Sequence, residues 1–168
     1  MPKTALLTSF APWRANHLSN SADDLLVELS SQWQKEPMHL LRQLPVNLPI
    51  AQSITVHKIN QLQPDVVLCC GMAEFRNRLS LESRAVNRHR QLQTSANLED
   101  LVAGLSLTEI SHDAGRFVCN ALYYGILNYL KCHSPGTLCL FVHVPILTFE
   151  NREGVVTDFC AILEKLTT

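Results

Sequence analysis

Asp65-Val66-Val67-Leu68-Cys69-Cys70, closed by Gly71, is the stretch of this sequence that decides the fold. Every residue between Asp65 and Gly71 is apolar, and a short apolar run that ends at a glycine is typical of a buried strand. Strands buried on both faces occur in parallel sheets that helices cover on both sides. We therefore predict a central strand over residues 65–70.

The sequence on either side of this run alternates between strand-like and helix-like segments. Apolar or alternating runs predict further strands over Thr4–Phe10, Met38–Val46, Leu79–Asn87 and Leu138–Val144. Helical spacing and capping residues predict helices from Asn20-Ser21 towards Lys35 and over Ile50–Leu62, Leu98–Leu105, Arg116–Leu130 and Val155–Leu166. The alternation predicts an α/β three-layer sandwich, with a mostly parallel or mixed central sheet flanked by helices on both faces. No repeat or linker divides residues 1–168, so we expect one domain.

The composition excludes several classes of protein. Apolar residues make up 46% of the 168 residues and charged residues 17%, which indicates a compact globular protein. The formal net charge is −1 and no basic stripe is present, so we expect neither nucleic-acid binding nor membrane binding. The N-terminus has neither the apolar region nor the cleavage site of a signal peptide, so we expect a cytoplasmic protein.

The six cysteines follow no regular spacing, and without an export signal we interpret them as reduced thiols. A zinc site built from Cys69-Cys70, Cys132-His133 and Cys139 is conceivable, but no C-x-x-C pair supports it. We therefore expect neither a metal nor a cofactor.

One cysteine has the setting of a nucleophile. The segment Ser111-His112-Asp113-Ala114-Gly115-Arg116-Phe117-Val118-Cys119-Asn120 places Cys119 in the first turn of an apolar helix, just after a glycine turn. The free N–H groups and the positive end of the helix dipole favour the thiolate there, and the thiolate is the nucleophilic form. Most cysteines are nevertheless small buried hydrophobic residues, so a nucleophile needs partner groups elsewhere in the chain.

His143 is the candidate base. It ends the apolar run Leu140-Phe141-Val142, where an imidazole must be hydrogen-bonded to be tolerated. Taken alone, His143 is better explained by a core histidine that bonds to a backbone carbonyl than by a catalytic base.

Glu82 is the candidate third group. It is flanked by Leu81 and followed by Ala85-Val86, so we expect its carboxylate to point inward, where it needs a partner. That partner could be Arg84 or Arg76 in a structural ion pair, or an imidazole that the carboxylate orients. Together with Cys119 and His143 it would supply nucleophile, base and orienting acid, and the N–H groups at the helix start could stabilise an oxyanion.

Three separated segments of this chain resemble pyroglutamyl peptidase I, a cysteine peptidase also called pyrrolidone-carboxylate peptidase. They are Leu79–Asn87, Ser111–Asn120 with Tyr123-Tyr124-Gly125, and Phe141–Pro145. Thr8–Trp13 matches the N-terminal loop of the family weakly. The resemblance implies an α/β sheet with flanking helices, in agreement with the pattern above.

The resemblance also implies a reaction. Glu82, Cys119 and His143 would form a catalytic triad that releases N-terminal pyroglutamate from small peptides. Cys119 would attack the carbonyl that joins pyroglutamate to the next residue, His143 would move the proton, and Glu82 would hold the ring. The positions that match the family's lactam-binding aromatic and backbone groups are Phe10, Trp13, Met72, Phe117 and Val118. By composition alone, Phe10 and Phe117 are better explained as core residues.

The sequence departs from the family pattern in several places. The chain is short, and the largest loss lies between Asn87 and Ser111, a region that in the family helps to enclose substrate and to pack subunits. Arg14-Ala15 stands where the family has Gly-Gly, Met72 where it often has Gln, and Phe75-Arg76 where it has Gly-Arg. These differences leave open another small lactam or N-acyl amide as substrate, a non-catalytic relative, and whether the chain forms a homo-oligomer.

Overall fold

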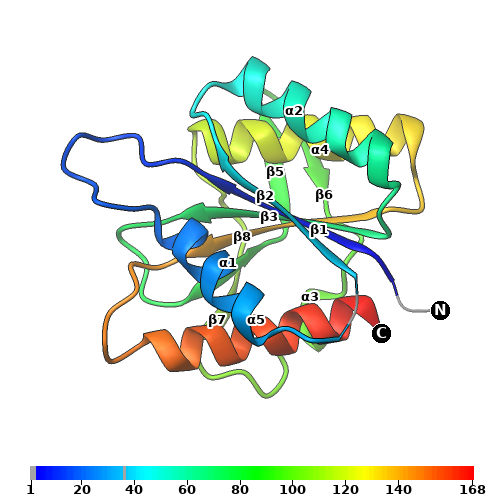
Figure 1. The fold of residues 1–168 in the computed structure, drawn as a ribbon. Coiled ribbons are helices and arrows are strands. Elements are labelled where there is room, and N and C mark those ends of the chain that lie inside the picture. Colours follow the sequence, from blue (N-terminus) through cyan, green and yellow to red (C-terminus); the bar gives the residue numbers. More distant parts are fainter. Residues whose placement is uncertain (1–2, 36) are drawn as a thin grey trace.

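A six-stranded sheet lies at the centre of the computed structural model, which describes residues 3–35 and 37–168 (Figure 1). The strands follow the order β2-β1-β3-β8-β4-β7. All neighbours run parallel except β4 and β8, which are antiparallel. The strands are β1 (Ala5–Phe10), β2 (Met38–Leu44), β3 (Val66–Met72), β4 (Leu79–Glu82), β7 (Thr108–Ser111) and β8 (Leu138–Val144). The predicted α/β architecture with a mixed central sheet is confirmed.

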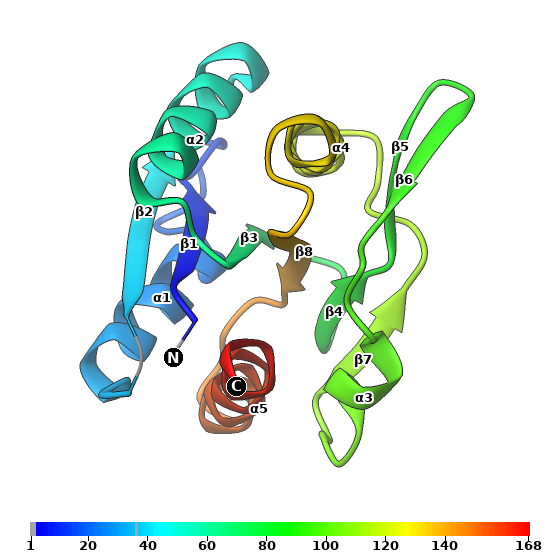
Figure 2. The same ribbon diagram turned by 90° about the vertical axis from the view of Figure 1, so that its right-hand side faces the viewer.

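Helices cover both faces of this sheet (Figure 2). On one side lie α2 (Leu48–Leu62) and α4 (Val118–His133), and on the other α1 (Ser21–Gln32), α3 (Leu98–Val102) and α5 (Arg152–Thr167). Along β3, Leu68 and Cys70 pack on the α1 and α5 side, whereas Val67 and Cys69 pack on the α2 and α4 side. Side chains alternate between the faces of a strand, so β3 must be apolar at every position to lie between two cores.

One predicted strand is wrong in its extent. Leu79–Asn87 is not continuous, because β4 ends at Glu82 and β5 (Arg84–Asn87) leaves the sheet. It pairs antiparallel with β6 (Arg90–Gln93) in a separate hairpin beside α4. Neither β6 nor β7 was predicted, and α3 ends earlier than the predicted Leu105.

The helix starts differ in a way that matters for the site. The Asn20 side chain accepts a hydrogen bond from the backbone N–H of Ala22, so it caps α1 as the sequence indicates. At the start of α4, Phe117 occupies the capping position and its side chain makes no capping hydrogen bond. The first N–H groups of an α-helix have no partner within the helix, and at α4 the capping side chain supplies none.

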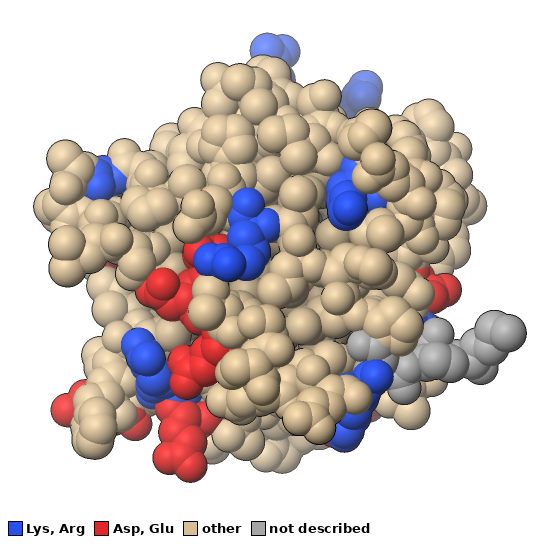
Figure 3. Space-filling model, viewed as in Figure 1, with Lys and Arg blue, Asp and Glu red and all other residues tan. Residues whose placement is uncertain are grey.

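None of the helices within the described residues has the length and hydropathy needed to cross a bilayer. All six cysteines are free thiols, and residues 3–35 and 37–168 contain no group of three or more potential ligand side chains placed to hold a metal ion. On the face shown in Figure 3, basic side chains lie scattered, several of them beside acidic ones.

Candidate active site

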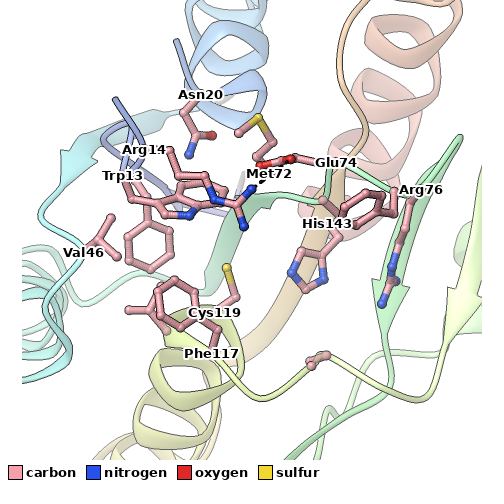
Figure 4. Close-up of a pocket in the computed structure, with 16 residues that line it drawn as sticks. Trp13, Arg14, Asn20, Val46, Met72, Glu74, Arg76, Phe117, Cys119 and His143 are labelled. Atoms are coloured by element: carbon pink, nitrogen blue, oxygen red, sulfur yellow. Dashed lines mark ion pairs between the residues drawn. The ribbon is translucent and has the colours of Figure 1, made fainter. Parts of the chain in front are cut away.

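A cavity of ≈ 310 Å³ opens where β1, β3 and β8 end (Figure 4). In an open α/β sheet, ligands bind beyond the carboxyl ends of the strands. The three segments that follow strands in the sequence, at residues 10–13, 71–76 and 143–145, all contribute to this region. The residues that line the cavity are Phe10, Trp13, Arg14, Asn20, Val46, Met72, Ala73, Glu74, Phe75, Arg76, Ala114, Gly115, Phe117, Val118, Cys119 and His143.

Cys119 is the second residue of α4, and its side chain lies against the end of β3. A Cβ atom added to Gly71 would lie 2.6 Å from Cys119 Sγ, so the thiol rests directly over the backbone of this glycine. Gly71 is in register with His143 across the parallel β3–β8 pair. The thiol and the imidazole therefore face the same space, as Figure 4 shows.

Glu82 meets His143 from the antiparallel side of the sheet. In the β4–β8 pair Ser80 is opposite His143 and Glu82 is opposite Phe141, so Glu82 and His143 are diagonal neighbours on one face. His143 Nδ1 lies 2.7 Å from Glu82 Oε1, and both residues are buried, with exposed fractions of 6% and 0%. A carboxylate only accepts hydrogen bonds, so Nδ1 donates to Glu82, and in the neutral ring the other nitrogen is an acceptor.

The Glu82 carboxylate also has a cation beside it. Arg76 Nη1 donates to the same Oε1 atom at 2.7 Å, while Arg84 donates its Nε–H to the carbonyl oxygen of His112. The two partners that the sequence offered for Glu82, an arginine and an imidazole, are therefore both present, and the arginine is Arg76.

Two side chains of α4 fix the nucleophile helix relative to this acid. The Tyr123 hydroxyl donates to the backbone oxygen of Glu82 at 2.9 Å, one helical turn after Cys119. The Asn120 amide bonds to both backbone groups of Val86, accepting from its N–H at 2.9 Å and donating to its carbonyl at 2.8 Å. The start of α4 is thereby tied to the ends of β4 and β5.

The ionisation of Cys119 differs from the sequence prediction. Burial, together with the neighbouring Cys69 and Glu82, raises the pKa of the Cys119 thiol to about 12. A backbone N–H at the helix start does act in the predicted direction, but it is the weakest of these influences. The free thiol is thus protonated at neutral pH, and the helix start alone does not make a thiolate.

Aromatic side chains form two walls of the cavity. The rings of Trp13 and Phe117 lie 6.5 Å apart with planes at 49°, and Phe10, which lines the same cavity, is almost fully buried. Phe117 is 59% exposed, so it belongs to the cavity mouth and not to the core, whereas Phe10 serves both. Met72 and Val118 line the same cavity, so all five predicted substrate-binding positions meet here.

Sequence reasoning missed Asn20 as a member of the site. Its side chain is 1% exposed, and Oδ1 is committed to the cap of α1. The amide nitrogen Nδ2 has no hydrogen-bond partner in the structure, yet the residue lines the cavity. Buried polar groups are nearly always paired, so this donor is available to a bound ligand.

Comparisons with known proteins agree with the geometry. The sequence model of the family described as pyroglutamyl peptidase matches residues 3–101 and 101–154. A pyrrolidone-carboxylate peptidase of Bacillus cereus is 25% identical over 171 residues, which cover 86% of this chain and 79% of the relative. One from Vibrio campbellii is 26% identical over 178 residues, covering 90% and 82%.

Solved structures show the same fold. Pyroglutamyl peptidase I from Bacillus amyloliquefaciens superposes with a TM-score of 0.83 and 21% identity, over 96% of this chain and 93% of that one. Pyrrolidone carboxyl peptidase from Fervidobacterium islandicum gives a TM-score of 0.84 and 20% identity, over 98% of both chains. At this identity the likeness establishes the architecture.

Proposed function

We propose that this chain, which belongs to the pyroglutamyl peptidase family, is a cysteine omega-peptidase. It removes N-terminal pyroglutamate from peptides. One observation carries the proposal. The His143 imidazole is held by Glu82 at 2.7 Å and shares an aromatic-lined cavity with the Cys119 thiol. Nucleophile, base and orienting acid together form the set that acyl transfer through a thiol requires.

The proton on Cys119 decides how the first step proceeds. Because the pKa of the thiol is raised to about 12, the proton must leave as sulfur attacks the pyroglutamyl carbonyl, and His143 receives it on the nitrogen that faces away from Glu82. The free N–H groups at the start of α4 stabilise the developing oxyanion. The imidazolium then protonates the leaving amine, and water releases pyroglutamate from Cys119.

The cavity provides a matching environment for the lactam. Its ring packs against the side chains of Trp13, Phe117 and Phe10, which offer it apolar faces. The unpaired Asn20 Nδ2 donates to the lactam carbonyl, which is an acceptor with no charge. Met72 and Val118 line the same cavity, and their backbone groups complete the polar contacts to the lactam.

A second substrate class is favoured by the openness of the mouth. Phe75 lines the cavity but is 93% exposed, and Phe117 is more than half exposed. A site that is less enclosed discriminates less strongly against other small lactams or N-acyl amides.

A substrate panel tests the proposal. Purified protein is assayed under reducing conditions with fluorogenic pyroglutamyl, prolyl and acetyl amides, with Cys119→Ala as the matched control. We expect Cys119-dependent release that is fastest from the pyroglutamyl amide. Faster release from the prolyl or acetyl amide would refute pyroglutamyl peptides as the preferred substrate. Release that persists in Cys119→Ala would refute the thiol mechanism.

We also propose that the protein acts in a reducing compartment, such as the cytoplasm. All six cysteines are free, and a thiol nucleophile has to stay reduced to work.

A further inference from the structure

Arg76 makes two hydrogen bonds that join separate parts of the site. Nη1 donates to Glu82 Oε1 and Nη2 donates to the carbonyl oxygen of Asp113, each at 2.7 Å. Glu82 ends β4, whereas Asp113 lies in the loop that leads into α4 and Cys119. One guanidinium therefore connects the acid of the triad to the loop that carries the nucleophile.

We propose that Arg76 is a positioning residue of this enzyme, which fixes the Glu82 carboxylate and sets how readily His143 takes up a proton. The proposal rests on the triad roles proposed above. In this role the Glu82 carboxylate pairs with two cations, with the Arg76 guanidinium at all times and with the His143 imidazolium during turnover.

The geometry at the carboxylate supports this role. His143 Nδ1 and Arg76 Nη1 are each 2.7 Å from Oε1, while the second oxygen, Oε2, is buried and has no hydrogen-bond partner. Glu82 is fully buried, and a buried carboxylate without a countercharge is costly. The Arg76 side chain is 26% exposed, so solvent screens its charge only in part.

The charge has a defined consequence for the base. A carboxylate whose charge is shared with Arg76 stabilises an imidazolium less than one that faces His143 alone. Arg76 therefore favours the neutral imidazole, which is the form that can accept the thiol proton. Further titratable or charged groups share this region: Cys119 on α4, and Arg14 and Glu74, line the cavity with His143. Glu109 of β7 accepts a hydrogen bond from Ser80, which lies opposite His143 on β4.

The second hydrogen bond acts on the nucleophile. The loop at Asp113 is braced by its own side chain, whose Oδ1 accepts from the Gly115 N–H and from Arg116. The Arg76 bond to the Asp113 carbonyl anchors this braced turn to the sheet. Loss of the anchor loosens Cys119 relative to His143, and a displacement of about 1 Å lowers turnover by up to about 100-fold.

Two substitutions separate the charge from the hydrogen bonds. Arg76→Gln removes the charge, whereas Arg76→Lys keeps it and loses the planar fork. Arg84→Gln is the matched control, because Arg84 also donates to a carbonyl oxygen in the same loop, that of His112, at 3.0 Å. Each variant is first checked for a wild-type unfolding temperature.

The readout is the acid limb of two pH profiles, one for kcat/KM on a pyroglutamyl amide and one for alkylation of Cys119 by iodoacetamide. We expect Arg76→Gln to move both limbs to higher pH by about one unit, because the imidazole is protonated more readily. Arg76→Lys should leave the acid limb of both pH profiles where it is in wild type, while kcat falls. Arg84→Gln should leave both acid limbs unchanged.

Three results would overturn the role of Arg76: an unmoved limb in Arg76→Gln, a limb that moves equally in Arg76→Lys, or one that moves in Arg84→Gln. The alkylation profile also separates this inference from the substrate assignment. If no pyroglutamyl amide is hydrolysed, the proposed function fails, while a limb shift confined to Arg76→Gln would still support the positioning role.

Discussion

The thiol of Cys119 rests on a glycine, and Gly71→Ala tests whether that contact sets its position. The added methyl group would lie 2.6 Å from Cys119 Sγ, and 2.8 Å and 3.2 Å from two ring carbons of Phe141. Phe141 cannot move aside easily, because its ring packs against those of Tyr123 and His143 at 5.7 Å and 4.8 Å between centroids.

The size of the effect follows from these distances. Nonbonded heavy atoms pack at about 3.5–4.0 Å, so the sulfur has to retreat by about 1 Å to accept the methyl group. A displacement of about 1 Å from the reacting geometry costs about 100-fold in rate, which equals about 2.7 kcal/mol of transition-state stabilisation. Overpacking against Phe141 should also lower the free energy of unfolding by about 1–3 kcal/mol.

The assay compares kcat/KM on a pyroglutamyl amide with the free energy of unfolding in denaturant. Gly136→Ala is the control, because a Cβ at Gly136 meets no atom within 4 Å, and we expect it to change neither quantity. Gly71→Ala should lose activity well beyond what its residual folded fraction explains. A folded Gly71→Ala protein with wild-type kcat/KM would refute the placement of the thiol over this glycine.

Three further predictions follow from the site. Glu82→Gln should lower kcat by about 100- to 10 000-fold, because the amide cannot hold the His143 tautomer. Wild-type kinetics would mean that Glu82 serves only in a structural ion pair. Asn20→Ser keeps a side-chain oxygen suited to capping α1 at Ala22 but removes the amide donor and adds no charge, so KM should rise about 10-fold with little change in unfolding temperature. An unchanged KM would show that the Asn20 side chain does not bind the substrate. In His143→Ala, the rate of Cys119 alkylation should be low at neutral pH and should rise steadily with pH, because the pKa of the thiol is about 12 and no base remains. Alkylation as fast as in wild type at neutral pH would contradict the mechanism.

The elements with strong local signals could be predicted from the sequence. The run at Asp65–Cys70 is apolar because helices cover both faces of β3, and the structure confirms that strand. Leu138–Val144 forms β8 at the predicted bounds. In both cases burial on two faces leaves a pattern that depends little on the rest of the chain.

The sequence carried no local signal for the break between β4 and β5 after Glu82. The Ser83 N–H bonds to the carbonyl oxygen of Ser111 in β7, and β5 then turns away to pair with β6. The Ser83–Ser111 pairing joins residues distant in sequence, and three of the four residues of β7 are polar, so its pattern is indistinguishable from that of a loop.

The site shows the same division. The positions of Cys119 and His143 could be predicted because each follows a local signal, the helix start and the end of an apolar strand. The raised pKa of Cys119 could not, because it depends on burial beside residues from other elements. Asn20 was predicted as a helix cap, which it is, but its second role depends on where α1 packs.

The central claim is that Cys119 carries the pyroglutamyl group during turnover, and mass spectrometry of the trapped enzyme tests it most directly. The protein is mixed with an activated pyroglutamyl ester, quenched in acid within the first turnover and digested. We predict one pyroglutamyl group on the peptide that contains Cys119, and no adduct in Cys119→Ala. An adduct on another residue, or turnover of the ester with no adduct on Cys119 at any quench time, would contradict the account.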